Sequence, residues 1–336
     1  MNTDQGIPRG KNRWRFVVVA AAMCTQMGPA GTAAAQEREE EVVANLATGR
    51  ALFCVTKDGI VVATVHTAAV PVDPGARAPG VVELPGGRVA VLLGAVEWVL
   101  PASGKEPVRL DAELPRLMTG AAVESPKAGE GETATDIETI GVRVLERLRE
   151  VASNLHRKIE LRAEEPLLEL LIAGHLPNYG PEVWRLSYRM VQDPLRGDFW
   201  RTRVLRPQSV QLYPPEKGQP RGILEVVYPA DAAGGSLAEL LTSSDPRVAR
   251  IRTSDAAMGR AVEKIAAGES HKSETAAASE FLRAALTAVV AQESPLVFGV
   301  ISEQRGVEWA LAPPEPAEKV QQPSEPGAPT LRKKRP

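Results

Sequence analysis

Two runs of apolar and β-branched residues meet at a short turn, and this pattern constrains the fold more than any other feature of the chain. Residues 51–56 and 60–65 flank Lys57-Asp58-Gly59, and a glycine directly after an acidic residue is a strong hairpin signal. Comparable runs surround Pro85-Gly86-Gly87 and Gln304-Arg305-Gly306. The sequence therefore predicts three β-hairpins, one of them close to the C-terminus.

The N-terminal residues have the pattern of an export signal. Basic residues between Lys11 and Arg15 precede an apolar stretch from Phe16 to Cys24, and Ala33-Ala34-Ala35 supplies small residues for cleavage. The apolar stretch is shorter than the roughly 20 residues that a membrane span needs. We therefore expect a signal peptide over residues 1–35 and an extracytoplasmic location, periplasmic or secreted, with no integral membrane span after cleavage. A retained anchor is the alternative.

Composition divides the remaining chain into a spacer, a folded domain and a tail. Residues 36–45 are highly charged, and residues 312–336 are rich in Pro, Glu, Gln and Ala and end in basic residues. A tail of this composition buries too little apolar surface to offset its ordering entropy, so we expect it to be disordered. Residues 46–311 then form the folded domain. The formal charge of −2 argues against a basic nucleic-acid-binding domain.

Periodic patterns between the hairpins predict further strands and helices. Apolar or alternating runs predict strands at 167–174, 184–188, 200–204, 209–212 and 223–228. Apolar residues at helical spacing, or capping signals, predict helices at 137–158, 246–266 and 273–292. Residues 101–134 carry Pro, Gly, Glu and Lys without apolar periodicity, and we expect a long surface loop there. Strands in blocks with helices grouped between them predict a layered α+β sandwich.

In this order of elements the chain resembles the proteasome-type branch of the N-terminal-nucleophile hydrolases. The resemblance is carried by the KDGIVVA hairpin, the VVELPGGRVAVLLG strand pair, the LLELLIAG strand followed by EVWRLSY, and the PLVFGVISEQRGVEWAL hairpin after two helices. It covers roughly residues 46–311. The resemblance implies a four-layer αββα sandwich, in which two antiparallel sheets are flanked by helices.

The same resemblance implies a site that this chain only partly supplies. The family uses the hydroxyl of an N-terminal threonine as nucleophile, with its own α-amine as base and a lysine nearby. Thr48 lies close to the nucleophile position, although counting from Gly59 places Gly49 there. No carboxylate occupies residues 64–66, where the acidic partner belongs, and no lysine occurs between residues 57 and 105. We therefore expect a scaffold without the family's catalysis.

Three hypotheses for the function follow. The first is an exported, non-catalytic binding or self-assembling module, whose partner is a second copy or an envelope protein. The second is an autoprocessed threonine-type amide or peptide hydrolase, with Thr48 as its nucleophile and weak candidate catalytic residue. The third is an envelope-binding module of unrelated β-rich fold.

The remaining reactive residue types indicate little further chemistry. Cys54 lies in a strand pattern, and we expect a buried, inert thiol. The histidines lack metal-ligand spacing, so we expect neither a metal nor a cofactor; they are His66, His156, His175 and His271. Arginines gather in one region, at positions 185, 189, 196, 201, 203 and 206. They predict a solvated strand face or loop rim, with an anion-binding patch as the alternative.

Overall fold

The computed structural model describes residues 43–66, 78–99, 107–119, 137–153, 159, 161, 164–176, 180–195, 199–215, 222–230, 235–290 and 296–313. The predicted signal peptide, most of the predicted spacer and the tail from residue 314 onward lie outside these residues. All the elements below belong to one compact unit that begins at Glu39.

Sheet A is antiparallel and contains most of the strands. Its main order is β1-β5-β7-β8-β11, and β4 and β6 also pair with β5. The strands are β1 (Val43–Ala47), β4 (Gly80–Leu84), β5 (Arg88–Val99), β6 (Val108–Arg109), β7 (Leu168–Leu176), β8 (Gly180–Tyr188) and β11 (Gln208–Tyr213).

Sheet B is also antiparallel and joins strands from both ends of the sequence. Its order is β12-β2-β3-β13-β14. The strands are β2 (Gly49–Val55), β3 (Gly59–Val65), β12 (Ile223–Tyr228), β13 (Leu296–Ser302) and β14 (Gly306–Leu311). A separate hairpin is formed by β9 (Met190–Pro194) and β10 (Trp200–Val204).

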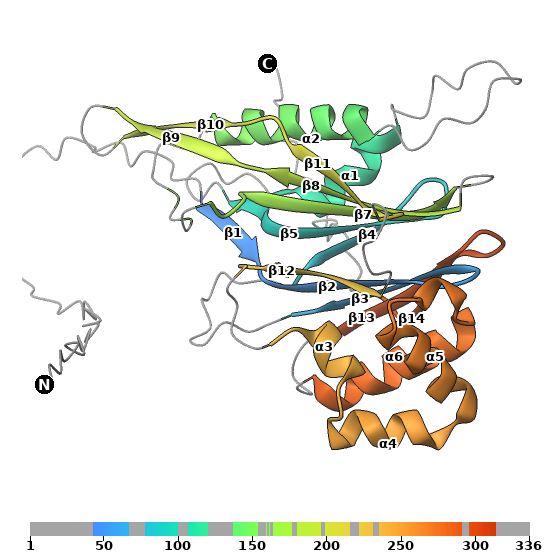
Figure 1. The fold of residues 1–336 in the computed structure, drawn as a ribbon. Coiled ribbons are helices and arrows are strands. Elements are labelled where there is room, and N and C mark those ends of the chain that lie inside the picture. Colours follow the sequence, from blue (N-terminus) through green and yellow to red (C-terminus); the bar gives the residue numbers. More distant parts are fainter. Residues whose placement is uncertain are drawn as a thin grey trace, which may run out of the picture. The chain divides into compact units, whose positions relative to one another are not determined.

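Helices cover the outer face of each sheet, as Figure 1 shows. Sheet A packs against α1 (Leu110–Thr119) and α2 (Ile137–Ala152). Sheet B packs against α3 (Leu237–Thr242), α4 (Pro246–Ser254), α5 (Ala256–Ala266) and α6 (Thr275–Val289), with a short 3-10 helix, Ser270–Lys272, between the last two.

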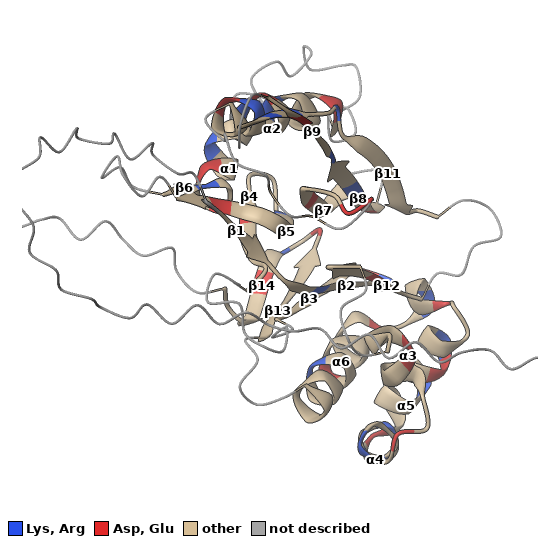
Figure 2. Ribbon diagram, turned by 90° about the vertical axis from the view of Figure 1, so that its left-hand side faces the viewer, with Lys and Arg blue, Asp and Glu red and all other residues tan. Residues whose placement is uncertain are grey.

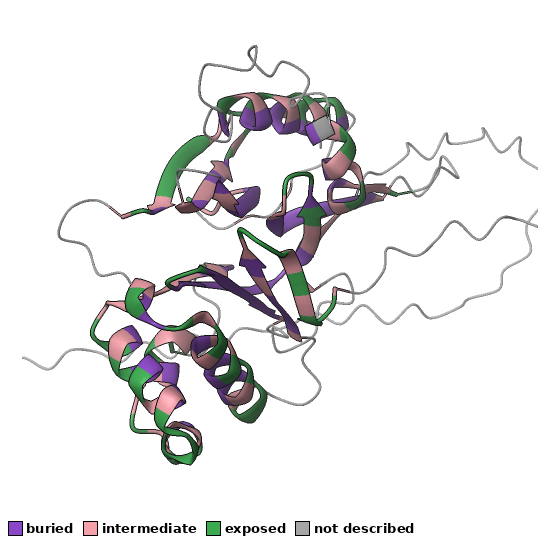
Figure 3. Cartoon of the chain, turned by 90° about the vertical axis from the view of Figure 1, so that its right-hand side faces the viewer, coloured by how far each residue is buried: buried purple, intermediate pink, exposed green. Residues whose placement is uncertain are grey.

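Three apolar cores separate these four layers. One lies between sheet A and its helices, one between the two sheets, and one between sheet B and its helices. Buried residues accordingly concentrate on the strands and on the inner faces of the helices (Figure 3). Charged residues lie mainly on the helices and at the ends of strands (Figure 2). The predicted α+β fold with four αββα layers is confirmed.

Local patterns explain why these segments form strands. In β7, Leu170 packs in the core beneath α2 and Leu171 packs in the core between the sheets. Burial on both faces accounts for the nearly continuous apolar run of this strand. In the β2–β3 turn, the hydroxyl of Thr56 donates to the carbonyl of Gly59 at 2.8 Å. All three predicted hairpins are confirmed.

Other predictions about elements are wrong in detail. The predicted surface loop at 101–134 contains β6 and α1, and α1 buries Leu110, Leu114 and Met118 on one stripe. Packing of this stripe outweighs the helix-breaking tendency of Pro115, which lies inside the helix. The last residues of the predicted spacer, 43–45, form the start of β1, which pairs with β5.

The boundaries of several helices and strands also differ from the prediction. The helix predicted at 246–266 is two helices, because the side chain of Asp255 accepts the backbone N–H groups of Ala257 and Met258 and starts a new helix. Helix α2 ends at Ala152 rather than at residue 158. Helix α3 and strand β9 are additional elements that the sequence patterns did not predict.

Candidate functional site

Thr48, the predicted nucleophile candidate, lies where the chain crosses from sheet A to sheet B. It connects β1 with β2 and is 8% exposed. Its backbone carbonyl lies 2.9 Å from Nδ1 of His66, the residue that follows β3. Because a carbonyl only accepts hydrogen bonds, Nδ1 of His66 carries the proton and donates it. His66 therefore holds the Thr48 corner through the backbone.

Gly49, the other position suggested for the nucleophile, has no room for a side chain. A Cβ atom built there lies 2.4 Å from the carbonyl oxygen of Val65 and 2.8 Å from the ring of Pro79. The backbone of β3 would have to move to accept it. A hydroxyl-bearing residue is therefore excluded at Gly49, and Thr48 is the residue of this pair that carries a nucleophilic group.

The strand before Thr48 is built into the fold. Strand β1 pairs with β5 from Val43 opposite Val99 to Ala47 opposite Gly94, and Ala47 is fully buried. In this arrangement the nitrogen of Thr48 belongs to a peptide bond. A peptide nitrogen is not a base, so an N-terminal-nucleophile mechanism first requires cleavage between β1 and β2.

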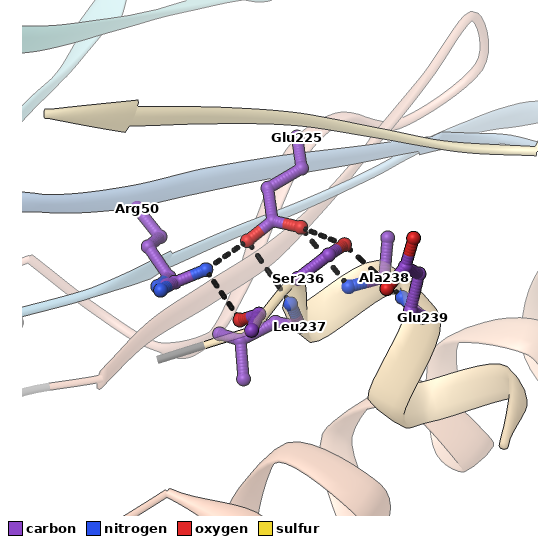
Figure 4. A network of polar contacts seen from close by, with 7 residues as sticks. Arg50, Glu225, Ser236, Leu237, Ala238 and Glu239 are labelled. Atoms are coloured by element: carbon purple, nitrogen blue, oxygen red, sulfur yellow. Dashed lines mark hydrogen bonds and ion pairs between the residues drawn. The ribbon is translucent and has the colours of Figure 1, made fainter. Parts of the chain in front are cut away.

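A buried ion pair lies two residues beyond Thr48. Arg50 donates from Nη1 to a carboxylate oxygen of Glu225 at 2.6 Å, and both side chains are almost fully buried. The same nitrogen donates to the backbone carbonyl of Gly235 at 3.0 Å. The pair joins β2 to β12, and Figure 4 shows it in place.

Glu225 also holds the first turn of α3. Its carboxylate accepts the hydroxyl of Ser236 at 2.6 Å and the backbone N–H groups of Leu237 and Ala238 at 3.1 Å (Figure 4). Burial raises the pKa of the Glu225 carboxyl, but the hydrogen bonds from Ser236, Ala238, Arg50 and Leu237 outweigh burial and lower it below its usual range. Both Arg50 and Glu225 are thus fully engaged by protein groups, which indicates a structural role.

An open cleft is lined by residues of β7, β8 and β11 and of the segments just before β7, after β8 and after β12. Its volume is about 590 Å³, within the range of small-molecule and peptide sites. The lining residues are Glu164, Glu165, Pro166, Glu169, Arg185, Ser187, Arg189, Gln208, Val210, Leu212 and Ala230.

A carboxylate that forms part of this lining is held by its neighbours. The side chain of Glu169 is 1% exposed and accepts hydrogen bonds from Nε and Nη2 of Arg185 and from the hydroxyl of Ser187. Hydrogen bonding to Glu169 raises the pKa of Arg185. With three donors bound, this carboxylate is a poor general base. The remaining N–H groups of Arg185 and the exposed Arg189 are donors suited to carbonyl or carboxylate groups.

The other singled-out residues do not converge on one site. Cys54 is buried in β2 as predicted, and burial raises its pKa to about 12, with a hydrogen bond from Ser270 acting in the opposite direction. His175 lies at the far end of β7, in a second hollow of about 650 Å³ beside Lys57, Asp58 and Ser302. His271 lies in the 3-10 helix, and His156 lies outside the described residues. Within the described part of the chain, no cluster of three or more His, Cys, Asp or Glu is placed to bind a metal ion.

The arginine cluster is divided between two places. Arg185 lies in the cleft, and Arg203 forms an ion pair with Asp193 across the β9–β10 hairpin at 2.9 Å. Arg189, Arg201 and Arg206 are exposed. Arg196 lies outside the described residues.

Sequence patterns missed the ion pairs of Arg50 with Glu225 and of Arg185 with Glu169. Glu169 interrupts an apolar run, and a carboxylate in such a run signals a partner because Glu is almost never fully buried unpaired. The partners, Arg185 for Glu169 and Glu225 for Arg50, are distant in sequence. The charged residues were therefore visible in the sequence, while their pairing depended on the sheet topology.

Comparisons with known proteins place the chain in no group. No protein-family model matches it, and no curated protein matches it. None of the helices in the described ranges is long and apolar enough to cross a membrane.

Proposed function

We propose that this chain is an exported, non-catalytic module of proteasome-like architecture that binds an extended segment of an envelope protein in the cleft beside β11. Export rests on the basic and apolar pattern of the first residues. The order of hairpins, long helix, central strand and closing hairpin supports the architecture, as do the four layers.

The outer edge of β11 is the observation that carries this proposal. This strand ends sheet A, and no strand of the described residues pairs with its outer side. Residues 208–211 are exposed, and Gln208 and Val210 line the cleft. An extended peptide adds to such an edge through main-chain hydrogen bonds, while the cleft selects its side chains. Arg185 and Arg189 favour a segment that carries acidic residues.

The Thr48 corner supports a role without catalysis. Thr48 follows a strand that is paired along its length, and the carboxylate in the cleft is occupied by three donors. Peptide binding requires neither a free amine at Thr48 nor an unoccupied Glu169 carboxylate. Hydrolysis by Thr48 needs a free α-amine, so the peptide bond between Ala47 and Thr48 must first be cleaved. That cleavage separates β1 from the rest of the chain.

A library of short random peptides tests the binding function. The full chain is expected to enrich peptides with acidic residues, and Val210→Asp is expected to weaken their binding roughly tenfold, since a negative charge on the edge opposes both strand addition and acidic peptides. Val142→Asp is the matched control, because Val142 is equally exposed and is not among the residues that line the cleft. Enrichment that is insensitive to Val210→Asp contradicts the proposal.

The same experiment detects a hydrolase. The peptides are incubated with the protein, and mass spectrometry follows both the peptides and the N-terminus of the protein. Peptide cleavage that disappears in Thr48→Ala, together with an N-terminus at Thr48, identifies a threonine-type amide hydrolase instead. The proposal expects intact peptides and a chain that retains the residues before Thr48.

A further inference from the structure

One residue that lines the cleft beside β11 has an unusual backbone conformation. Glu164 has a φ of 68°, and among the described residues it is the one residue other than glycine with a positive φ. Residues with a Cβ atom rarely adopt this left-handed region, and glutamate lacks the short polar side chain that helps Asn and Asp to adopt it. Such conformations cluster where a protein clamps a ligand, so Glu164 is a candidate binding residue.

The residues that follow Glu164 are held firmly in place. We call residues 164–166, which line one side of the cleft, the wall. Pro166 restricts the residue before it to extended conformations, and its carbonyl accepts the hydroxyl of Tyr228 at 3.1 Å. Leu167 then donates its backbone N–H to the carbonyl of Tyr188 at 2.7 Å, and its own carbonyl accepts an N–H group of β5 at 2.8 Å. Hydrogen bonds to three strands therefore fix the wall and keep Glu164 in its conformation.

The carboxylate of Glu164 is available for binding. The side chain is exposed, and among the described residues no hydrogen bond or ion pair engages it. Glu169, the buried carboxylate of the same cleft, is instead occupied by three donors. No contact of the Glu164 side chain within the described fold therefore compensates for its backbone strain, which favours a role in binding.

Positive charges line the same cleft without meeting Glu164. Arg185 lies in β8 and is paired with Glu169, and Arg189 follows the end of β8 and is exposed. Within the described part of the chain no ion pair joins Glu164 to either arginine. The cleft therefore presents a carboxylate on its wall and guanidinium groups on its sheet, and both kinds of charge remain open to a ligand.

We propose that Glu164 recognises a basic residue of the segment that binds in the cleft, an inference that rests on the proposed function. In an extended segment, alternate side chains point to the same side. A segment whose acidic residue meets Arg185 or Arg189 can thus direct a basic residue, two positions away, at the wall. The partner is therefore a segment of mixed charge, in which acidic and basic residues alternate on the side that faces the cleft.

The charges of the cleft favour this mixed segment over a purely acidic one. Much of the positive charge of Arg185 is already balanced by Glu169. A segment with acidic residues alone would place one of them beside the unpaired carboxylate of Glu164, where like charges repel. Attraction at the arginines and repulsion at the wall thus act together, and specificity commonly combines the two.

Fluorescence anisotropy with synthetic peptides tests the inference. The probes are labelled Val-Thr-Glu-Thr-Lys-Thr-Val, the same peptide with Glu and Lys exchanged, and a version of each with Gln in place of Lys. Both orders are used because strands pair in either direction. In at least one order, the full chain is expected to bind the Lys peptide roughly threefold more tightly than its Gln version, as for an exposed ion pair.

A double-mutant cycle assigns this preference to one residue. Glu164→Gln, which leaves the backbone strain unchanged, is expected to remove the preference for Lys without altering the affinity for the Gln peptide. Glu164→Lys is expected to reverse the preference. Arg189→Gln is expected to weaken both versions equally, because Arg189 acts on the Glu of the peptide. Glu303→Gln is the matched control, since Glu303 is exposed and lies outside the cleft lining, and it is expected to bind like the wild type.

The outcomes separate this inference from the proposed function. Urea midpoints first establish that each variant is folded. If the wild type binds both versions equally, or if Glu164→Gln weakens both equally, the inference is overturned, while loss of binding in Val210→Asp still supports the peptide cleft. If no peptide binds the wild type, or if Val210→Asp binds every peptide like the wild type, the proposed function fails and the inference fails with it.

Discussion

At the scale of single residues, the Arg50–Glu225 pair is the most consequential contact near the predicted site. Two elements distant in sequence and the first turn of α3 meet at one carboxylate. Removing one member leaves the other buried without its opposite charge. The contact therefore fixes the end of sheet B beside Thr48.

Replacing Arg50 with Leu is expected to lower the free energy of unfolding by about 3–5 kcal/mol, the usual cost of orphaning a buried charge. Urea unfolding followed by tryptophan emission measures this change. Arg283→Leu is the control, because Arg283 is exposed on α6. A loss for Arg50→Leu no larger than that of the control would show that the pair contributes little.

The pH dependence of Glu225 has a definite sign. Its pKa is lowered in the folded protein, so its contribution to stability is complete above the unfolded pKa of about 4.3 and decreases as pH falls through the folded value. Wild type is expected to lose more of its urea midpoint between neutral and acidic pH than Glu225→Gln does. Parallel losses in the two proteins contradict the assignment.

The Cys54 thiol is expected to be unreactive in the native protein. A rise in pKa from 9.0 to about 12 reduces its thiolate fraction roughly a thousandfold at neutral pH. A Cys24→Ser variant leaves Cys54 as the sole cysteine, and its reaction with a thiol reagent is compared with and without guanidinium chloride. Rapid labelling of the folded chain is the outcome that rejects this expectation.

At the scale of elements, the hairpins were predictable because their signals are local. Lys57-Asp58-Gly59 contains both the turn residue and its flanking strands within a few positions. Helix α1 was not predictable in this way. Its stripe of Leu110, Leu114 and Met118 is sparse, and Pro115 in the middle signals a loop, so only packing against sheet A makes the segment helical.

The break between α4 and α5 is an element-scale feature with a simple test. Asp255→Ala removes the acceptor for two N–H groups of α5 and is expected to cost about 1 kcal/mol. Asp255→Asn keeps a side-chain oxygen that accepts the same bonds and is expected to lose only a few tenths. Urea midpoints of the three proteins give the comparison. If Asn and Ala are equally destabilised, the cap is not the reason for the break.

The candidate site was less predictable than the fold. The sequence suggested Thr48 through a resemblance, and the structure places it at a corner between the sheets. The cleft beside β11 draws on residues from Glu164 to Ala230, which become neighbours only through the pairing of β7, β8 and β11. Local sequence carries no record of that pairing, because each strand alone reads as an ordinary strand.

At the scale of the whole molecule, β1 links the question of catalysis to stability. A chain that begins at Thr48 lacks β1 and exposes part of the core around Leu46 and Ala47. It is expected to be less stable than a chain that begins at Glu39 by about 2–5 kcal/mol, comparable to losing a buried aliphatic side chain. Urea unfolding of both chains measures the difference. Equal stability would restore Thr48 as a possible processed end.

The composition of sheet B has a consequence for how the protein is made. Strand β3 pairs with β13, and Val65 lies opposite Leu296. The partner of β3 is therefore synthesised long after β3 itself. A ribosome that adds roughly 5–20 residues per second needs on the order of 10–50 s to span that interval. During this time the nascent β2–β3 hairpin presents apolar surface to its surroundings. The edge of β3 therefore stays without its β13 partner for most of the time that the chain is being synthesised.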